Sequence, residues 1–109
     1  MNLRFYFRRL HVKIKHKPTV LVMKPEGLAM IRVQYDIPYF SIYVNKPYRG
    51  QGYSIKLLET LFEKCRGRYD AIFGTINIDN NQMRYICRKL GFKKVGEFNN
   101  RYLMMKKLS

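Results

Sequence analysis

One stretch near the middle of the chain decides the fold: residues 40–54, which read FSIYVNKPYRGQGYS. β-Branched and aromatic residues fill positions 39–44, a composition typical of a β-strand, and Pro47 ends that run. Gly50 and Gly52 then free the backbone to turn sharply and leave room for a ligand beside the main chain. The stretch therefore predicts a strand, a tight turn and the start of a helix.

The residues after this turn have the spacing of an amphipathic helix over about 53–66. Its apolar positions are Ile55, Leu58, Leu61, Phe62 and Cys65. A helix that starts directly after glycines exposes unpaired N–H groups at the positive end of the helix dipole. The pattern predicts an anion site there, most often for a phosphate, with an ordinary glycine turn as the alternative.

Strand-like runs and turn residues account for most of the remaining chain. Strands are predicted at 3–10, 19–23, 28–35, 71–78, 93–98 and 101–107, and residues 11–17 form either a strand or an extended arm. Turn-forming residues at 24–27, 36–38 and 99–100 connect them. A second helix follows the capping cluster at 79–81 and runs to about Leu90. Its apolar side carries Met83, Ile86, Cys87 and Leu90.

Length and charge limit the kinds of protein this can be. A chain of 109 residues makes one small domain, and no apolar run approaches the roughly 18 residues of a membrane-spanning helix. The formal net charge is +15, and no acidic residue precedes Glu26. Such a field attracts polyanions, namely nucleic acid, an acidic protein or a multiply charged cofactor. The alternative is a basic surface that serves only solubility.

The two cysteines predict a reduced protein without a metal site. Cys65 and Cys87 fall in different predicted helices and do not have the spacing of metal ligands. The basic N-terminal segment is interrupted by charges every few residues, unlike a signal peptide. We therefore expect free thiols and a cytoplasmic location.

Two motifs resemble those of a known family. Arg49-x-x-Gly52-x-Ser54 is similar to the acetyl-coenzyme A signature of the GNAT superfamily of N-acetyltransferases, Gln/Arg-x-x-Gly-x-Gly/Ala, with serine at the last position. Asn80 and the run Lys89-Leu90-Gly91-Phe92 stand in register with the second helix of that family. The resemblance covers about residues 19–108. It implies the GNAT fold, an α/β (α+β) domain over 1–109 with a mixed, mostly antiparallel sheet, two main helices and an abbreviated N-terminal helical region.

The resemblance also implies how acetyl-coenzyme A (acetyl-CoA) is bound. Backbone amides from Gln51 to Ser54 would hold the pyrophosphate, and Arg49 would add charge and hold the loop. The pantetheine arm would pair with the strand from Ile42 to Val44, and Asn80 would reach the arm or simply cap its helix. The implied cofactor-binding residues are Ile42, Tyr43, Val44, Arg49, Gly50, Gln51, Gly52, Tyr53, Ser54 and Asn80.

The catalytic groups are less well defined by the same resemblance. Cys87 occupies the position where the family often has a tyrosine that protonates the leaving thiolate, although a buried core residue is the alternative. Tyr85 lies roughly 200° away around the helix and cannot simply replace it. Asp36 precedes the strand where one branch of the family has a glutamate base, with a plain turn residue as the alternative.

The sequence thus predicts a minimal acetyl-CoA-dependent N-acetyltransferase that acts on an amine, either on a protein or in a small molecule. Members of this family usually have two helices between the first and second strands, and these helices shape the acceptor site. Here only about ten residues are available for that segment, which implies an open acceptor groove or one completed by a second subunit of a homodimer. Two alternatives remain: a basic nucleic-acid-binding module on the same fold, and a coenzyme A-binding protein with weak or no catalysis. The basic N-terminal arm would hold a nucleic acid or an acidic protein.

Overall fold

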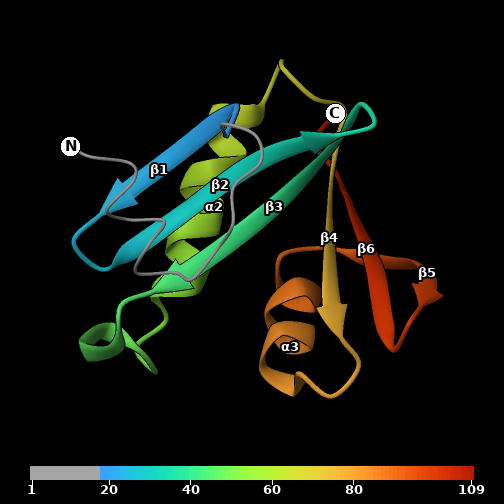
Figure 1. Ribbon diagram of the computed structural model, residues 1–109. Helices are drawn as coiled ribbons and strands as arrows, with labels where there is room; N and C mark the ends of the chain where they lie inside the picture. The colour runs from blue at the N-terminus through green and yellow to red at the C-terminus, as the bar shows by residue number, and fades with distance from the viewer. Residues whose placement is uncertain (1–17) are drawn as a thin grey trace.

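The computed structural model describes residues 18–109 and shows an α/β domain (Figure 1). Its elements are β1 (Val20–Lys24), β2 (Gly27–Gln34), β3 (Ile37–Val44), the 3-10 turn η1 (Lys46–Tyr48), α2 (Tyr53–Cys65), β4 (Ala71–Asn77), α3 (Asn81–Lys89), β5 (Lys93–Phe98) and β6 (Arg101–Lys107). The strand predicted at 3–10 and the strand or arm at 11–17 lie outside the described residues. Neither described helix is long and apolar enough to cross a lipid bilayer.

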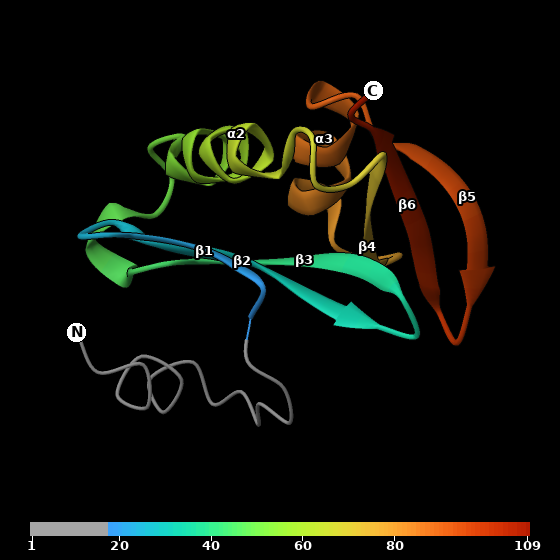
Figure 2. The same ribbon diagram turned by 90° about the horizontal axis from the view of Figure 1, so that it is seen from above.

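The six strands form one sheet in the order β1-β2-β3-β4-β6-β5. Neighbouring strands are antiparallel, except that β3 and β4 are parallel. Figure 2 shows α2 and α3 on the same side of the sheet. The architecture confirms the predicted fold class of a mixed, mostly antiparallel sheet with two main helices.

All three predicted turns connect strands directly, and two of them are shorter than expected. Only Pro25 and Glu26 separate β1 from β2. Tyr35 and Asp36, both with positive φ (50° and 63°), form the whole turn between β2 and β3. The expectation that residues 36–38 form a linker was therefore wrong, because β3 already begins at Ile37. Pro38 fits within this strand because its ring nitrogen points away from β2. Asn99 and Asn100 form the predicted turn between β5 and β6.

β3 is paired very differently on its two sides. It shares eight register pairs with β2, but within residues 18–109 it shares only one with β4, Tyr39↔Phe73. In Figure 1 the two strands lie close at one end and diverge toward α3. Among the described strands, none pairs with the edge of β3 from Ser41 to Val44 that faces β4.

An aromatic cluster holds the two helices against β3. The ring centroids of Phe40 and Phe92 lie 5.2 Å apart, and those of Phe62 and Phe92 lie 5.6 Å apart. Gly74 on β4 makes room for this cluster, since a Cβ there would overlap the Phe40 ring. The packing brings β3, α2 and α3 together at the point where the sheet opens.

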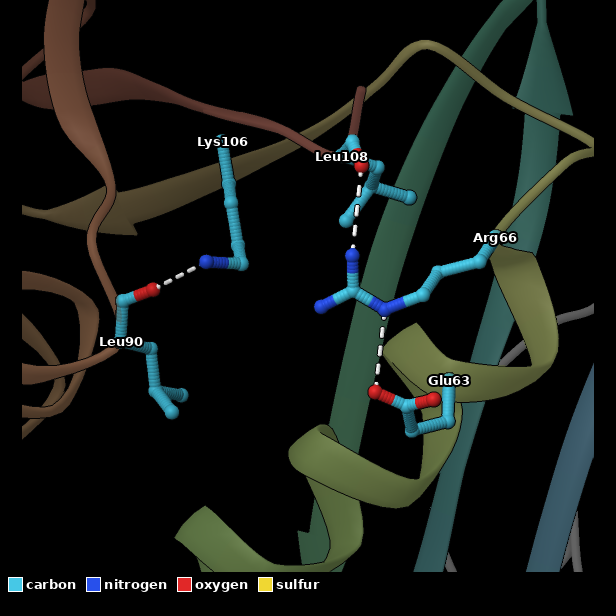
Figure 3. A network of polar contacts seen from close by, with 5 residues as sticks. All are labelled: Glu63, Arg66, Leu90, Lys106 and Leu108. Carbon is cyan, nitrogen blue, oxygen red and sulfur yellow. Dashed lines mark hydrogen bonds and ion pairs between the residues drawn. The ribbon is translucent and has the colours of Figure 1, made fainter.

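Polar contacts tie the C-terminal ends of both helices to the end of the chain (Figure 3). Lys106 Nζ donates to the carbonyl oxygen of Leu90, 2.6 Å away, at the end of α3. Arg66 donates to Glu63 Oε1 at 3.0 Å and to the carbonyl oxygen of Leu108 at 3.3 Å. Positive charge at a helix C-terminus also stabilises the helix dipole. These contacts anchor the C-terminal ends of the two helices to residues near the C-terminus of the chain.

Candidate functional site

The loop between β3 and α2 is held by side chains that donate to backbone carbonyls. Arg49 Nε donates to the Val44 oxygen at 3.0 Å, and Gln51 Nε2 donates to the Pro47 oxygen at 3.1 Å. Gly50 and Gly52 adopt positive φ values of 75° and 81°, which glycine tolerates without strain. The sequence therefore fixes the path of this loop through side-chain donors and two glycines.

The N-terminus of α2 is left open by this loop. Its N-cap is Gly52, so no side-chain oxygen accepts a hydrogen bond from the first helical amides. The first turn of the helix contains no acidic residue. The unpaired N–H groups and the positive end of the dipole thus face outward, an arrangement that favours an anion. Arg49 lies beside them, with its guanidinium 5.4 Å from the ring centroid of Tyr43.

The register of β3 shows which of its backbone groups face the opening. The amide of Asn45 donates to the Glu26 oxygen, and hydrogen-bonded pairs alternate along an antiparallel ladder. The backbone groups of Ile42 and Val44 consequently point away from β2. The Tyr43 carbonyl instead faces β2, where a Cβ on Gly27 would overlap it. Of the three predicted pantetheine partners, the strand geometry leaves Ile42 and Val44 with backbone groups directed to the free edge.

A cavity of about 420 Å³ joins the open helix N-terminus to the free strand edge. We call it the helix-mouth cavity. It brings together most of the predicted cofactor residues: Ile42, Tyr43, Val44, Arg49, Gly50, Gly52, Tyr53 and Ser54. Gln51 is not among the lining residues, and its side chain donates to the Pro47 oxygen within the loop. Residues of α3, among them Met83 and Tyr85, form the opposite wall.

A second cavity, of about 630 Å³, occupies the place where β3 and β4 separate. We call it the gap cavity. Its lining includes Phe40 and Ile42, whose side chains face the helices, and Tyr39 and Ser41, whose side chains face the other side of the sheet. The gap cavity is thus lined by residues whose side chains belong to both faces of the sheet. It shares Ile42 and Met83 with the helix-mouth cavity, so the two cavities adjoin at these residues.

The structure places Asn80 at the start of α3, beside the gap cavity. Its Oδ1 accepts a hydrogen bond from the Met83 amide at 3.1 Å, which is the capping role that the sequence left as one of two alternatives. Asn80 does not line the helix-mouth cavity. Asn80 does line the gap cavity, close to Met83, which both cavities share.

The two predicted catalytic residues are not brought together with the cofactor residues. Asp36 is exposed in the β2–β3 turn and lines neither cavity. Cys87 is fully buried in the core and also lines neither cavity. Burial raises the pKa of the Cys87 thiol to about 11. Tyr85 is 58% exposed and lines the helix-mouth cavity but not the gap cavity, where the strands separate.

Several lining residues were not identified from the sequence. Met83 and Ile86 were assigned to the core because they lie on the apolar stripe of α3, yet they also form a wall of the helix-mouth cavity. Arg32 and Arg101 line the gap cavity from β2 and β6. An arginine at position 32, within a strongly apolar run, was the one sequence signal for a polar cavity on that face. No cluster of three potential metal ligands occurs within residues 18–109.

The fold is similar to that of solved acetyltransferases. A ribosomal-protein-alanine N-acetyltransferase from Brucella melitensis aligns with a TM-score of 0.68 and 20% identity over 80% of this chain and 66% of that one. A GNAT-family acetyltransferase from Streptococcus pneumoniae gives 0.68 and 22% over 77% and 60%. A protein from Salmonella typhimurium, solved with its cofactor acetyl-CoA, gives 0.66 and 21% over 77% and 58%.

At these identities the similarity shows a shared fold, and the chain spans less than two thirds of the length of these structures. No curated protein sequence shows significant similarity to it. A model of the acetyltransferase (GNAT) family, however, matches residues 6–92, which confirms the resemblance seen in the two motifs. Since that match covers most of the chain, this protein belongs to the acetyltransferase (GNAT) family.

Proposed function

We propose that this protein binds acetyl-CoA along the helix-mouth cavity and transfers the acetyl group to an amine that enters through the gap cavity. The observation that carries this proposal is the junction at Ile42 and Met83. There, a cavity that contains an open helix N-terminus and a free strand edge adjoins a second cavity that is lined from both faces of the sheet. A long phosphate-containing cofactor and a separate acceptor need such a pair of adjacent sites.

The diphosphate of acetyl-CoA would bind at the N-terminus of α2. Amides from Gln51 to Ser54 would donate to its oxygens, and Arg49 would supply positive charge. The residues fit this group because neither a capping side chain nor an acidic residue of the first turn occupies the helix mouth. Nε of Arg49 holds the loop through Val44, and no other residue within 18–109 accepts a hydrogen bond from its remaining guanidinium nitrogens, which could donate to a phosphate.

The pantetheine arm would extend along the free edge of β3. Val44 and Ile42 point their backbone groups to that side, so the arm could pair with them as an additional strand would. This path leads from the helix mouth to the junction of the two cavities. The Ile42 amide would then be a donor that could stabilise negative charge on the thioester carbonyl oxygen.

Acetyl-CoA would supply a thioester carbonyl whose thiolate leaves readily near neutral pH. Among the described residues that line the gap cavity, none has a carboxylate or imidazole that could remove a proton from the acceptor. The acceptor amine would therefore lose its proton to water before it attacks. Cys87 is not placed to protonate the thiolate, because its sulfur is buried away from both cavities.

Calorimetry with acetyl-CoA, combined with a thiol-release assay over a panel of amines, tests the proposal. We expect saturable binding of acetyl-CoA and release of free thiol only when an amine is present, with the acetylated amine identified by mass spectrometry. Absence of acetyl-CoA binding would contradict the site. Binding without any acetylated amine would favour the alternative of a coenzyme A-binding protein without catalysis.

Other expectations from the sequence stay predictions. The basic arm, which would hold a nucleic acid or an acidic protein, lies within residues 1–17 and outside the described part of the chain. Whether the acceptor is a protein or a small molecule, whether a homodimer completes the acceptor site and whether the protein is cytoplasmic are likewise predictions. A gel shift with DNA and RNA at increasing salt would test the nucleic-acid alternative directly.

A further inference from the structure

Two arginines line the gap cavity from opposite sides of the opening in the sheet. Arg32 projects from β2, next to β3, and Arg101 from β6, next to β4. Both lie on the face of the sheet away from the helices, as do Tyr39 and Ser41. An acceptor that enters from this face to reach the junction of the cavities would pass between the two guanidinium groups.

Neither arginine has an anionic partner in the described part of the chain. Arg32 Nη2 donates to Ser41 Oγ at 3.3 Å, and Arg101 Nη1 donates to Thr75 Oγ1 at 3.4 Å, both long contacts to neutral hydroxyls. The Nε atom of Arg32 is buried and has no hydrogen-bond partner among residues 18–109. Residues 1–17 contain no acidic side chain that could supply one. A buried guanidinium N–H without an acceptor is energetically unfavourable, and a ligand oxygen would satisfy it.

The remaining residues that line the gap cavity also lack negative charge. The described polar residues of the gap cavity are neutral or positively charged, and none is acidic. A cationic acceptor such as a polyamine or a lysine-rich tail would find no counter-charge there and would be repelled by both arginines. A carboxylate or phosphate, by contrast, could accept paired hydrogen bonds from a guanidinium.

We propose that the acceptor is a small amine that also carries an anionic group, a carboxylate or a phosphate, which Arg32 and Arg101 bind while the amine reaches the junction. This inference rests on the proposed function, since it assigns the gap cavity to the acceptor. The cavity volume of about 630 Å³ lies within the range of sites for small molecules. The two positive charges also favour the neutral form of a nearby amine, which is the form that attacks the thioester.

Matched pairs of amines test the charge preference. Each of the common L-amino acids is compared with its carboxamide, and O-phosphoethanolamine with ethanolamine, first by calorimetry on the protein saturated with coenzyme A and then by thiol release from acetyl-CoA. We expect at least one anionic amine to bind about tenfold or more tightly than its neutral partner, a factor typical of one charge-assisted hydrogen bond. The amino acid and phosphate pairs distinguish a carboxylate from a phosphate.

Variants test whether the two arginines cause the preference for anionic over neutral amines. Arg32→Gln and the more exposed Arg101→Gln should each reduce the preference to about threefold or less, while the affinity for the neutral partner stays within twofold. Arg32→Lys should restore part of it, because the charge remains but the paired donors are lost. Lys93→Gln, an equal loss of charge at an exposed position outside both cavities, should leave the preference unchanged.

The outcomes separate this inference from the proposed function. Charge-selective binding without acetylation would support the binding of an anionic amine by the two arginines and overturn the transferase activity. Acetylation of neutral amines at equal or higher efficiency would keep the transferase and overturn the anionic acceptor. The anionic acceptor is also overturned if no anionic amine binds more tightly than its neutral partner. It is overturned as well if Arg32→Gln and Arg101→Gln reduce the affinity for both members of a pair equally.

Discussion

The two helices of this domain begin in opposite ways. α2 starts at Gly52, with no side-chain cap and no acidic residue in its first turn. α3 starts at Asn80, whose side chain accepts a hydrogen bond from the Met83 amide at 3.1 Å. Every helix begins with amides that lack partners within the helix. In α3 the side chain of Asn80 satisfies one of them, whereas in α2 no capping side chain satisfies any.

This difference matches the roles that we assign to the two helices. The open end of α2 lines the helix-mouth cavity together with Arg49, and there we place the diphosphate. The capped end of α3 stands beside the gap cavity, and its Met83 lines both cavities at their junction. A helix N-terminus that is capped by its own side chain stabilises the cavity wall that the helix forms, whereas an uncapped N-terminus can bind an anion. Variants at each end should therefore separate stability from cofactor binding.

The largest effect on acetyl-CoA affinity is expected from a substitution that caps the N-terminus of α2. Gly52→Asp puts a carboxylate where it can cap α2 and repel the diphosphate. We expect the dissociation constant of acetyl-CoA, measured by calorimetry, to rise by about 30-fold or more, which corresponds to about 2 kcal/mol. Gly67→Asp is the matched control, because Gly67 has a similar φ of 82° at the other end of α2 and open space around it. Equal affinities for the two variants would show that the diphosphate binds elsewhere.

A smaller loss is expected from the charge beside the open end. Arg49→Gln removes a cation and the Nε donor to the Val44 oxygen. We expect acetyl-CoA affinity to fall about tenfold at low salt, with a weaker dependence on sodium chloride than in the unsubstituted protein. Lys46→Gln changes the charge equally on an exposed residue that lines neither cavity, and it should change affinity less than twofold. Matching losses for the two variants would mean that only net charge matters.

At the capped end the effect should fall on stability instead. Asn80→Ala removes the acceptor of the Met83 amide, which should cost about 1 kcal/mol of folding free energy. For a domain of this size that is roughly 4–8 °C in Tm by calorimetry or circular dichroism. Acetyl-CoA affinity should stay within twofold, and Asn80→Asp should keep the cap. A tenfold loss of affinity in Asn80→Ala would assign this residue to the cofactor as well.

The smallest effect is expected further along α3, at Cys87. Because burial raises the pKa of this thiol to about 11, it stays protonated over the usual assay range and should contribute no inflection between pH 6 and 10. We expect Cys87→Ala to keep the pH profile of kcat/KM unchanged and kcat within about threefold. An inflection that disappears in the variant would make Cys87 a catalytic acid after all.

The same raised pKa has a consequence for stability. The unfolded chain loses the thiol proton near its ordinary pKa of 9.0, before the folded protein does. The contribution of neutral Cys87 to stability is therefore complete below that value and is lost as the pH rises toward about 11. Urea midpoints between pH 7 and 10 should fall more steeply in the unsubstituted protein than in Cys87→Ala.

The part of the site built from neighbouring residues was predictable from the sequence. The strand, the turn at Gly50 and Gly52 and the start of α2 follow one another within residues 40–54, so local composition and spacing were sufficient. The Asn80 cap at the start of the second helix was equally local. Each of these features depends on backbone preferences that act over a few residues.

The part of the site that depends on tertiary packing was not predictable in the same way. The gap cavity takes residues from five strands and from the start of α3, and its existence depends on β3 and β4 separating after a single pair. Sequence spacing does not reveal that separation, nor that Arg32 and Arg101 approach from opposite sides. The position of Asp36 was equally hidden, since the two-residue turn places it at the far end of the β2–β3 hairpin.

The account depends most on the claim that the open N-terminus of α2 binds the diphosphate of acetyl-CoA. Titration of ¹⁵N-labelled protein with coenzyme A, followed by backbone amide resonances, tests it directly. We predict that the largest shifts fall on the amides from Gln51 to Ser54, with much smaller shifts at Asn81 and Arg84, which lie at the capped start of α3 and line neither cavity. Larger shifts at these two amides than at the start of α2, or no shift at the start of α2 at saturating ligand, would contradict the account.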